Sequence, residues 1–144
     1  MLIKIIAVGK IKDKGLLNKI NEFAKWVSRY AKLEIVEIRD SKVEKEGEAI
    51  LKAIGKDKAY VFALGEEGEE FTSNQFSSKL QKISKKLIFV IGGPFGLAPE
   101  VKQRADIIFS LSKMTFTHEM ARLFLLEQVY RAIDIAKGGK YHNN

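Results

Sequence analysis

Apolar residues along this chain follow two patterns, short continuous runs and longer stretches in which they recur every three or four positions. The first pattern is typical of buried strands and the second of amphipathic helices. The runs predict strands at Leu2–Val8, Leu33–Ile38, Ala59–Leu64, Leu87–Ile91 and Ile107–Leu111. The helical spacing predicts helices at Leu16–Tyr30, Glu44–Ile54, Ser73–Ser84, Pro99–Arg104 and His118–Lys137.

Alternating strands and helices of this kind favour an α/β fold, with a mostly parallel sheet between helix layers. Because no linker, repeat or low-complexity segment interrupts the alternation, we expect a single domain over residues 1–144. Ligands of such sheets bind beyond the carboxyl ends of the strands. Three strands end in loops of unusual composition, at Leu64-Gly65, Ile91-Gly92-Gly93 and Leu111-Ser112-Lys113. We therefore expect the functional site at these three ends.

The segment 85–101, KKLIFVIGGPFGLAPEV, combines a strand with an unusual number of residues that control the backbone. Both prolines of the chain and three of its eleven glycines lie in it. Glycine lets a ligand lie directly against the main chain. The spacing is neither that of a phosphate loop nor that of a dinucleotide-binding fingerprint, and Pro94 lacks the N–H that an anion would need. The segment predicts either one wall of a pocket for a different ligand or a tight turn without a ligand.

The charge balance favours a polyanionic partner. The chain has 25 Lys and Arg against 18 Asp and Glu, a net charge of +7, and residues 10–32 alone hold seven cations and two anions. A basic helix of this kind suits nucleic acid, although a lysine-rich solvated surface would give the same count. Absent cysteines exclude thiol nucleophiles and Cys-based zinc sites. No apolar run reaches the roughly 20 residues of a membrane span, and the N-terminal run is too short for a signal peptide, so we expect a cytoplasmic protein without a membrane partner.

The C-terminal third holds the remaining candidates for chemistry. Ser112–Thr117 is a short polar loop, and Thr117 is placed to cap the following helix. Arg122 falls on the apolar side of that helix, where a cation needs a partner. A second subunit, a ligand or a carboxylate of the same fold would supply it. The tail places Tyr141 and His142 after a Gly138-Gly139 hinge.

These segments together resemble one family. The motifs MLIKIIAVGKIK, KEGEAIL, FVIGGPFGL, SLSKMTFTHEMARLFLLEQVYRA and the terminal YH are similar to those of the RlmH family, pseudouridine methyltransferases of the SPOUT (α/β-knot) class. The likeness covers essentially the whole chain. It implies a C-terminal deep trefoil knot, a homodimer, and S-adenosylmethionine bound in a bent form by the knotted loops. The implied reaction is methylation of N3 of a pseudouridine in the inter-subunit hairpin of 23S rRNA, in the large subunit or the assembled ribosome, without a metal.

The resemblance also implies roles for particular residues. The catalytic residues would be His142 as the proton acceptor, with His118 as the second candidate, Tyr141 against the base, and Arg122 at the dimer interface or near the substrate backbone. Two positions depart from the family pattern, Thr117 where many members have proline, and Asn143-Asn144 where a basic residue follows the histidine. The cofactor contacts would be Leu64, Gly93, Ser112, Lys113, Met114, Thr115, Phe116 and Thr117.

Two other functions are compatible with the same features. A SPOUT methyltransferase that acts on tRNA would share the pocket, although such enzymes often carry an added RNA-binding domain. A non-catalytic RNA- or ribosome-binding module would use the basic N-terminal helix and no cofactor. A flavodoxin-like nucleotide domain is disfavoured, because the phosphate loop is missing.

Overall fold

The computed structural model, which describes residues 1–143, contains one five-stranded sheet in the order β2-β1-β4-β3-β5. Every pair of neighbouring strands is parallel. The predicted parallel α/β sheet is therefore confirmed. The strands are β1 (Leu2–Val8), β2 (Lys32–Ile38), β3 (Ala59–Glu70), β4 (Lys86–Ile91) and β5 (Ile107–Ser110).

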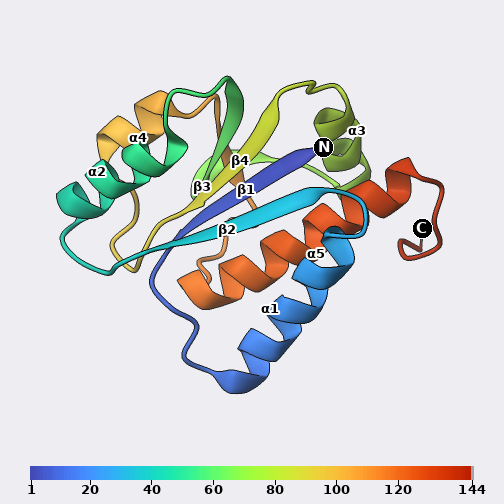
Figure 1. Ribbon diagram of the computed structural model, residues 1–144, viewed down its shortest axis with the longest axis horizontal. Coiled ribbons are helices and arrows are strands. Elements are labelled where there is room, and N and C mark those ends of the chain that lie inside the picture. The colour runs from blue at the N-terminus through green and yellow to red at the C-terminus, as the bar shows by residue number, and fades with distance from the viewer. Residues whose placement is uncertain (144) are drawn as a thin grey trace.

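Helices cover both faces of the sheet (Figure 1). One face carries α1 (Lys14–Val27), α3 (Ser73–Gln81) and α5 (His118–Ala136), and the other carries α2 (Val43–Ile54) and α4 (Pro99–Arg104). Within residues 1–143, no helix has the length and hydrophobicity needed to cross a bilayer.

The alternation of side chains along each strand divides the core into two halves. On β1, Ile3 and Ile5 pack with α1, α3 and α5, whereas Ile6 and Val8 pack with α2 and α4. A strand buried on both faces must be apolar at every position, which is why these strands appear as continuous apolar runs. Aromatic rings fill the first half, including Phe62 stacked on Phe89 with centroids 4.6 Å apart.

Strand β3 extends beyond its predicted end at Leu64. The acidic segment GEEGEE was expected to be a loop, but Glu69 and Glu70 pair with β5 after an irregularity that begins at Leu64. Gly68 allows the close approach, since a Cβ there would collide with the backbone of Ile108. The irregularity shifts the register of β3 against β5, and it lies at the edge of the sheet that is formed by the carboxyl ends of β4 and β5.

Candidate active site

A cleft of about 810 Å³ opens at the carboxyl ends of β3, β4 and β5. Three loops line it: residues 64–67 in the irregular part of β3, residues 91–97 after β4, and residues from the 111–119 segment that leads into α5. The three strand ends that the sequence predicted to meet therefore do meet. The residues proposed for the cofactor that line the cleft are Leu64, Gly93, Ser112, Met114, Thr115, Phe116 and Thr117. Lys113 is exposed and is not part of the lining.

The glycine turn after β4 forms one wall of the cleft from bare main chain. Gly96 has a φ of +83°, a conformation that side chains disfavour, and its N–H donates to the carbonyl oxygen of Gly93 at 3.0 Å. A Cβ on Gly92 would lie 2.9 Å from the carbonyl oxygen of Gly96. The segment is thus a tight turn that also lines the cleft, and its binding of a ligand stays a prediction.

The 112–117 loop is held in place by its own hydroxyl groups. The Ser112 hydroxyl accepts from the N–H of Met114 at 3.0 Å, and Thr117 caps α5 by accepting from the N–H of Met120 at 3.2 Å. Across the cleft, the Thr115 hydroxyl donates to a carboxylate oxygen of Glu66. This bond connects the loop after β5 to the irregular part of β3, so the two walls are joined.

The lining suits a ligand that combines an apolar ring system with positive charge. Apolar walls come from Leu64, Leu97 and Phe116, while Glu66 and Glu119 add carboxylates. Glu67 also lines the cleft, but its carboxylate is paired with Lys102 at 3.5 Å. S-Adenosylmethionine offers an adenine ring, a sulfonium and an ammonium group. A bare backbone wall beside apolar side chains and carboxylates is complementary to these groups, so the residues present fit this cofactor.

Arg122 has its partners within its own chain. Its side chain is 3% exposed, and it donates to Glu37 Oε2 at 2.7 Å and to the carbonyl oxygen of Gly9 at 2.9 Å. Its Nε has no hydrogen-bond partner among residues 1–143. Of the three partners left open by the sequence, a carboxylate of the same fold is the one observed. Arg122 joins α5 to the ends of β1 and β2 and does not line the cleft. Its proposed catalytic role remains a prediction.

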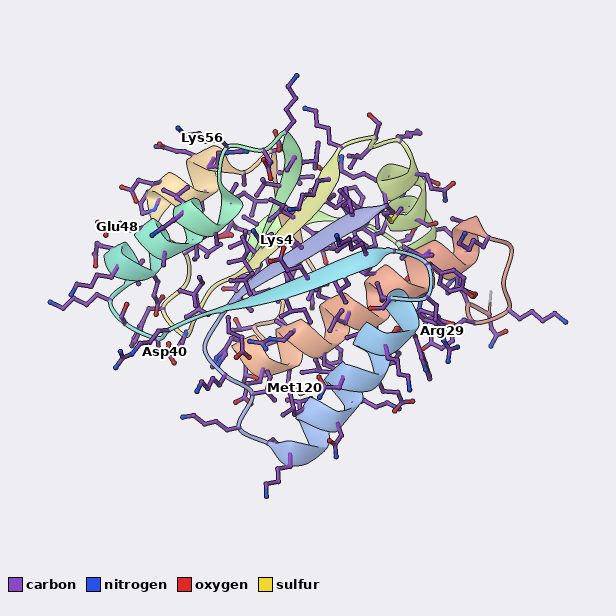
Figure 2. The ribbon with its side chains drawn as sticks, viewed as in Figure 1. Lys4, Arg29, Asp40, Glu48, Lys56 and Met120 are labelled. Carbon is purple, nitrogen blue, oxygen red and sulfur yellow. The ribbon has the colours of Figure 1, made fainter. Side chains whose placement is uncertain are left out.

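His118, the second candidate for the proton acceptor, lines the cleft. It meets a polar cluster with Asp40 and Glu46, two residues that the sequence analysis missed. A Cβ on Gly9 would lie 3.1 Å from His118 Nε2 and 3.5 Å from Asp40 Oδ2, so these two side chains converge there. Glu46 is 5% exposed and accepts from the N–H of Ser41 at 2.9 Å. Figure 2 shows Asp40 at the end of β2. The burial of Glu46 could have been predicted from the sequence, because Glu46 lies four and eight residues before Ile50 and Ile54, on the apolar side of α2.

The tail lies at the opposite end of α5 from the cleft (Figure 1). This helix has 19 residues, which at about 1.5 Å per residue separates its two ends by roughly 28 Å. The tail is also docked: the N–H of Tyr141 donates to Asp134 Oδ2 at 2.9 Å, and its ring packs against Tyr130 with centroids 4.9 Å apart. Burial raises the pKa of Tyr141 above its ordinary value, so its phenol stays protonated at neutral pH.

His142 is in contact with Arg131, which lies about one and a half turns before the end of α5. Nδ1 of His142 lies 3.0 Å from Nη1 of Arg131. The same guanidinium is held by Glu127, with Nη2–Oε1 and Nε–Oε1 distances of 2.7 and 2.9 Å. The hydrogen bond to Glu127 raises the pKa of Arg131. Glu127 and Arg131 are four residues apart on α5, so their side chains share one side of the helix. Of the departures from the family pattern, Asn143 follows the docked histidine and Asn144 lies outside the described residues.

Comparison with known proteins defines the class to which this fold and cleft belong. The chain matches the family described as "Predicted SPOUT methyltransferase" over residues 1–142. The protein therefore belongs to the SPOUT methyltransferase family. A solved structure of the SpoU methyltransferase AviRb from Streptomyces viridochromogenes, in complex with AdoMet, has a TM-score of 0.53 at 14% identity. The match covers 96% of this chain and 59% of that one, and it shows similarity of fold.

Within that class, full-length relatives share one name. The chain is 49% identical over 140 residues to "Ribosomal RNA large subunit methyltransferase H" of Prochlorococcus marinus, covering 96% of this chain and 94% of the relative. It is 40% identical to the protein of the same name from Streptococcus thermophilus, covering 99% of both. The family resemblance found in the sequence motifs is thereby confirmed.

Proposed function

We propose that this protein is an S-adenosylmethionine-dependent methyltransferase that modifies 23S rRNA at N3 of a pseudouridine in the inter-subunit hairpin. The observation that carries the proposal is the cleft at three strand ends, in a chain that matches ribosomal RNA large subunit methyltransferases along its whole length. The excess of basic residues in 10–32 suits an RNA partner. A ribosomal substrate places the protein in the cytoplasm.

The cofactor would lie between the glycine turn and the 112–117 loop. Bound there, S-adenosylmethionine supplies an electrophilic methyl group on a positively charged sulfur. The main chain at Gly93 allows the nucleoside to approach, Leu64 and Phe116 cover its apolar surface, and Glu66 and Glu119 favour its positive charge. By holding the ligand on two joined walls, the loops supply the positioning on which methyl transfer depends.

The reaction replaces one N–H bond with one N–C bond. The N3 proton passes to solvent water, and the N3 electron pair forms a bond to the methyl carbon. The electron pair of the broken sulfur–carbon bond stays on sulfur, so the products are the methylated base and a neutral thioether. Tyr141 and His142 would contact the base, and the carboxylates of the cleft favour the charged cofactor before transfer.

We propose a homodimer because one chain cannot bring its tail to its own cleft. The two lie at opposite ends of α5, and the tail is docked at its end by Asp134 and Tyr130. A second copy would bring its tail to the cleft of the first. At the cleft, Phe95 is 87% exposed and Met114 is 76% exposed, and exposed apolar side chains of this size mark an interaction surface.

We also propose the C-terminal trefoil knot. The fold of the AviRb relative and the position of the 112–117 loop against residues 92–97 support it. Pulling the chain from its two ends would test it, since a knotted chain tightens and reaches a shorter final length than 144 residues allow. A full-length extension would refute the knot.

A methyl-transfer assay tests the function as a whole. The purified protein is incubated with labelled S-adenosylmethionine and with assembled ribosomes, naked 23S rRNA or tRNA. We expect label at N3 of one 23S pseudouridine, with ribosomes and naked rRNA compared side by side. Label in tRNA alone would refute the substrate. No heat of binding with the cofactor in calorimetry, together with RNA binding, would identify a non-catalytic module instead.

A further inference from the structure

We propose that Arg131 is a positioning residue that fixes His142 in one tautomer, so that His142 donates a hydrogen bond to the target base from Nε2 and does not accept its proton. The inference rests on the proposed function, because it assigns His142 a place in the methyl transfer. It replaces the role of proton acceptor that the sequence suggested for this histidine.

The first step is the direction of the hydrogen bond between the two side chains. A guanidinium has only N–H donors and no acceptor. The 3.0 Å contact of Arg131 Nη1 with Nδ1 therefore requires Nδ1 of His142 to accept. A neutral imidazole has one nitrogen that accepts and one that carries hydrogen. With Nδ1 as the acceptor, the hydrogen is on Nε2, and Nε2 has no free electron pair with which to take up a proton.

The second step is the rigidity of the arginine. Glu127 binds two nitrogens of Arg131, Nε and Nη2, and leaves Nη1 to face His142. The guanidinium carbon lies 4.7 Å from the centroid of the Tyr141 ring. A planar fork held on one side by a carboxylate and on its face by an aromatic ring has little freedom to turn.

The third step is the position of the histidine in the chain. The adjacent residue Tyr141 is fixed through its N–H to Asp134, and its ring also packs near Trp26 at 6.4 Å. His142 is therefore presented on an ordered segment, with its ring direction set by Arg131. A donor that is already oriented needs no rearrangement when charge develops on a substrate, which is the property that makes such donors effective.

The chemistry of the base fits a donor. When N3 loses its proton to solvent water, the negative charge spreads over O2 and O4 of the pyrimidine ring. An N–H directed at either oxygen stabilises this anion, and the N3 electron pair then forms the bond to the methyl carbon while the sulfur–carbon pair remains on sulfur. The proton goes to water and not to His142.

Nitrogen NMR measures the tautomer directly. The protein has two histidines, so long-range nitrogen–proton correlations of the wild type and of His118→Gln assign both rings. We expect the Nε2–H pattern for His142 in the wild type, a mixture of tautomers in Arg131→Met, and the wild-type pattern in the control Arg104→Met. Arg131→Lys, which keeps one donor, should fall between them. An Nδ1–H pattern in the wild type, or no change in Arg131→Met, would overturn the proposal.

Activity separates a donor from a base. Glutamine carries an N–H at nearly the position of Nε2 and cannot act as a base at neutral pH. We expect His142→Gln to be at least about tenfold more active than His142→Ala, at equal affinity for the cofactor. Equal loss in both variants would overturn the donor role. If the wild type methylates no RNA, the proposed function is refuted, and so is the contact of His142 with a target base. The NMR pattern would still show whether Arg131 fixes the tautomer of the His142 ring.

Discussion

Removing Glu37 should destabilise the protein only when Arg122 is present. Arg122 is 3% exposed and Glu37 is 40% exposed, so the two partners of this ion pair differ in their access to water. In Glu37→Ala, Arg122 retains the carbonyl oxygen of Gly9 but loses its only carboxylate. Breaking a buried pair from one side costs about 3–5 kcal/mol. Because the Glu37 side is open to solvent, we expect the lower value of about 2–3 kcal/mol.

The matched background is Arg122→Met, which keeps much of the volume and removes the charge. There Glu37 has no buried cation to compensate, and Glu37→Ala should change the free energy of unfolding by less than about 0.5 kcal/mol, the usual effect of a surface substitution. The double-mutant cycle should therefore give a coupling energy of about 2 kcal/mol. Arg122→Met itself leaves the Gly9 carbonyl without its arginine donor, so it should cost about 1–3 kcal/mol.

Urea unfolding of the four proteins, with equal m-values as the check on two-state behaviour, measures the cycle. For a domain of this size, a loss of 2–3 kcal/mol corresponds to a fall of about 4–12 °C in Tm. Effects that add to within about 0.5 kcal/mol would show that the pair contributes nothing in solution. Arg122→Met then has a second use, since methyl transfer by the folded variant tests whether Arg122 does more than join α5 to β1 and β2.

Three further predictions concern the cleft, a helix cap and the tail. Gly92→Ala should weaken cofactor binding, measured by calorimetry, by about tenfold or more. The added Cβ would lie 2.9 Å from the Gly96 carbonyl oxygen and displace the turn. An unchanged affinity would contradict a place for this turn in the cofactor site. Asp13→Ala should lower the free energy of unfolding by about 1 kcal/mol, since Asp13 accepts from the N–H of Leu16 at 2.8 Å, whereas Asp13→Asn should restore most of it. Burial raises the pKa of Tyr141, so its phenol should ionise above pH 10.0 in an ultraviolet titration, and Tyr141→Phe should remove this ionisation. The contribution of the buried phenol to the free energy of unfolding should be present below pH 10.0 and be lost as the pH rises through the higher pKa of the folded state.

The predictable parts of the fold are the strands and helices whose burial imposes a pattern of apolar residues within one segment of the chain. Strands such as β4 are buried on both faces and must be apolar throughout. The helical spacing predicted α1 from Leu16, and the helix begins two residues earlier, at Lys14, because Asp13 caps it. The last six positions of β3, residues 65–70, were not predicted as strand. Glu69 and Glu70 are charged and pair along one edge with β5, so no periodicity marked them as strand.

The site was predictable as a place and less so as a set of contacts. Glycines and hydroxyl residues at three strand ends indicated the cleft, because parallel strands bring their carboxyl ends to one edge. The partner of Arg122 depends on how α5 lies against β2, and the ring of Tyr141 depends on Trp26 and Tyr130 of two other segments. Contacts between segments far apart in the sequence leave no local pattern. The Gly138-Gly139 pair suggested a hinge before the tail, whereas the contacts of Tyr141 with Asp134 and Tyr130 dock the tail against α5.

Helix α5 connects the two halves of the proposed chemistry and fixes their separation. Thr117 of the cleft loop caps its first turn, Arg122 anchors its second turn, and Asp134 in its last turn holds the tail. Because the helix is anchored at both ends, it keeps the cleft and the tail of one chain apart, so a tail would reach a cleft only from a second chain. In the proposed homodimer, the tail of each copy would move with its α5 as one rigid unit. The way in which the two copies pack against each other would then decide where His142 meets the base.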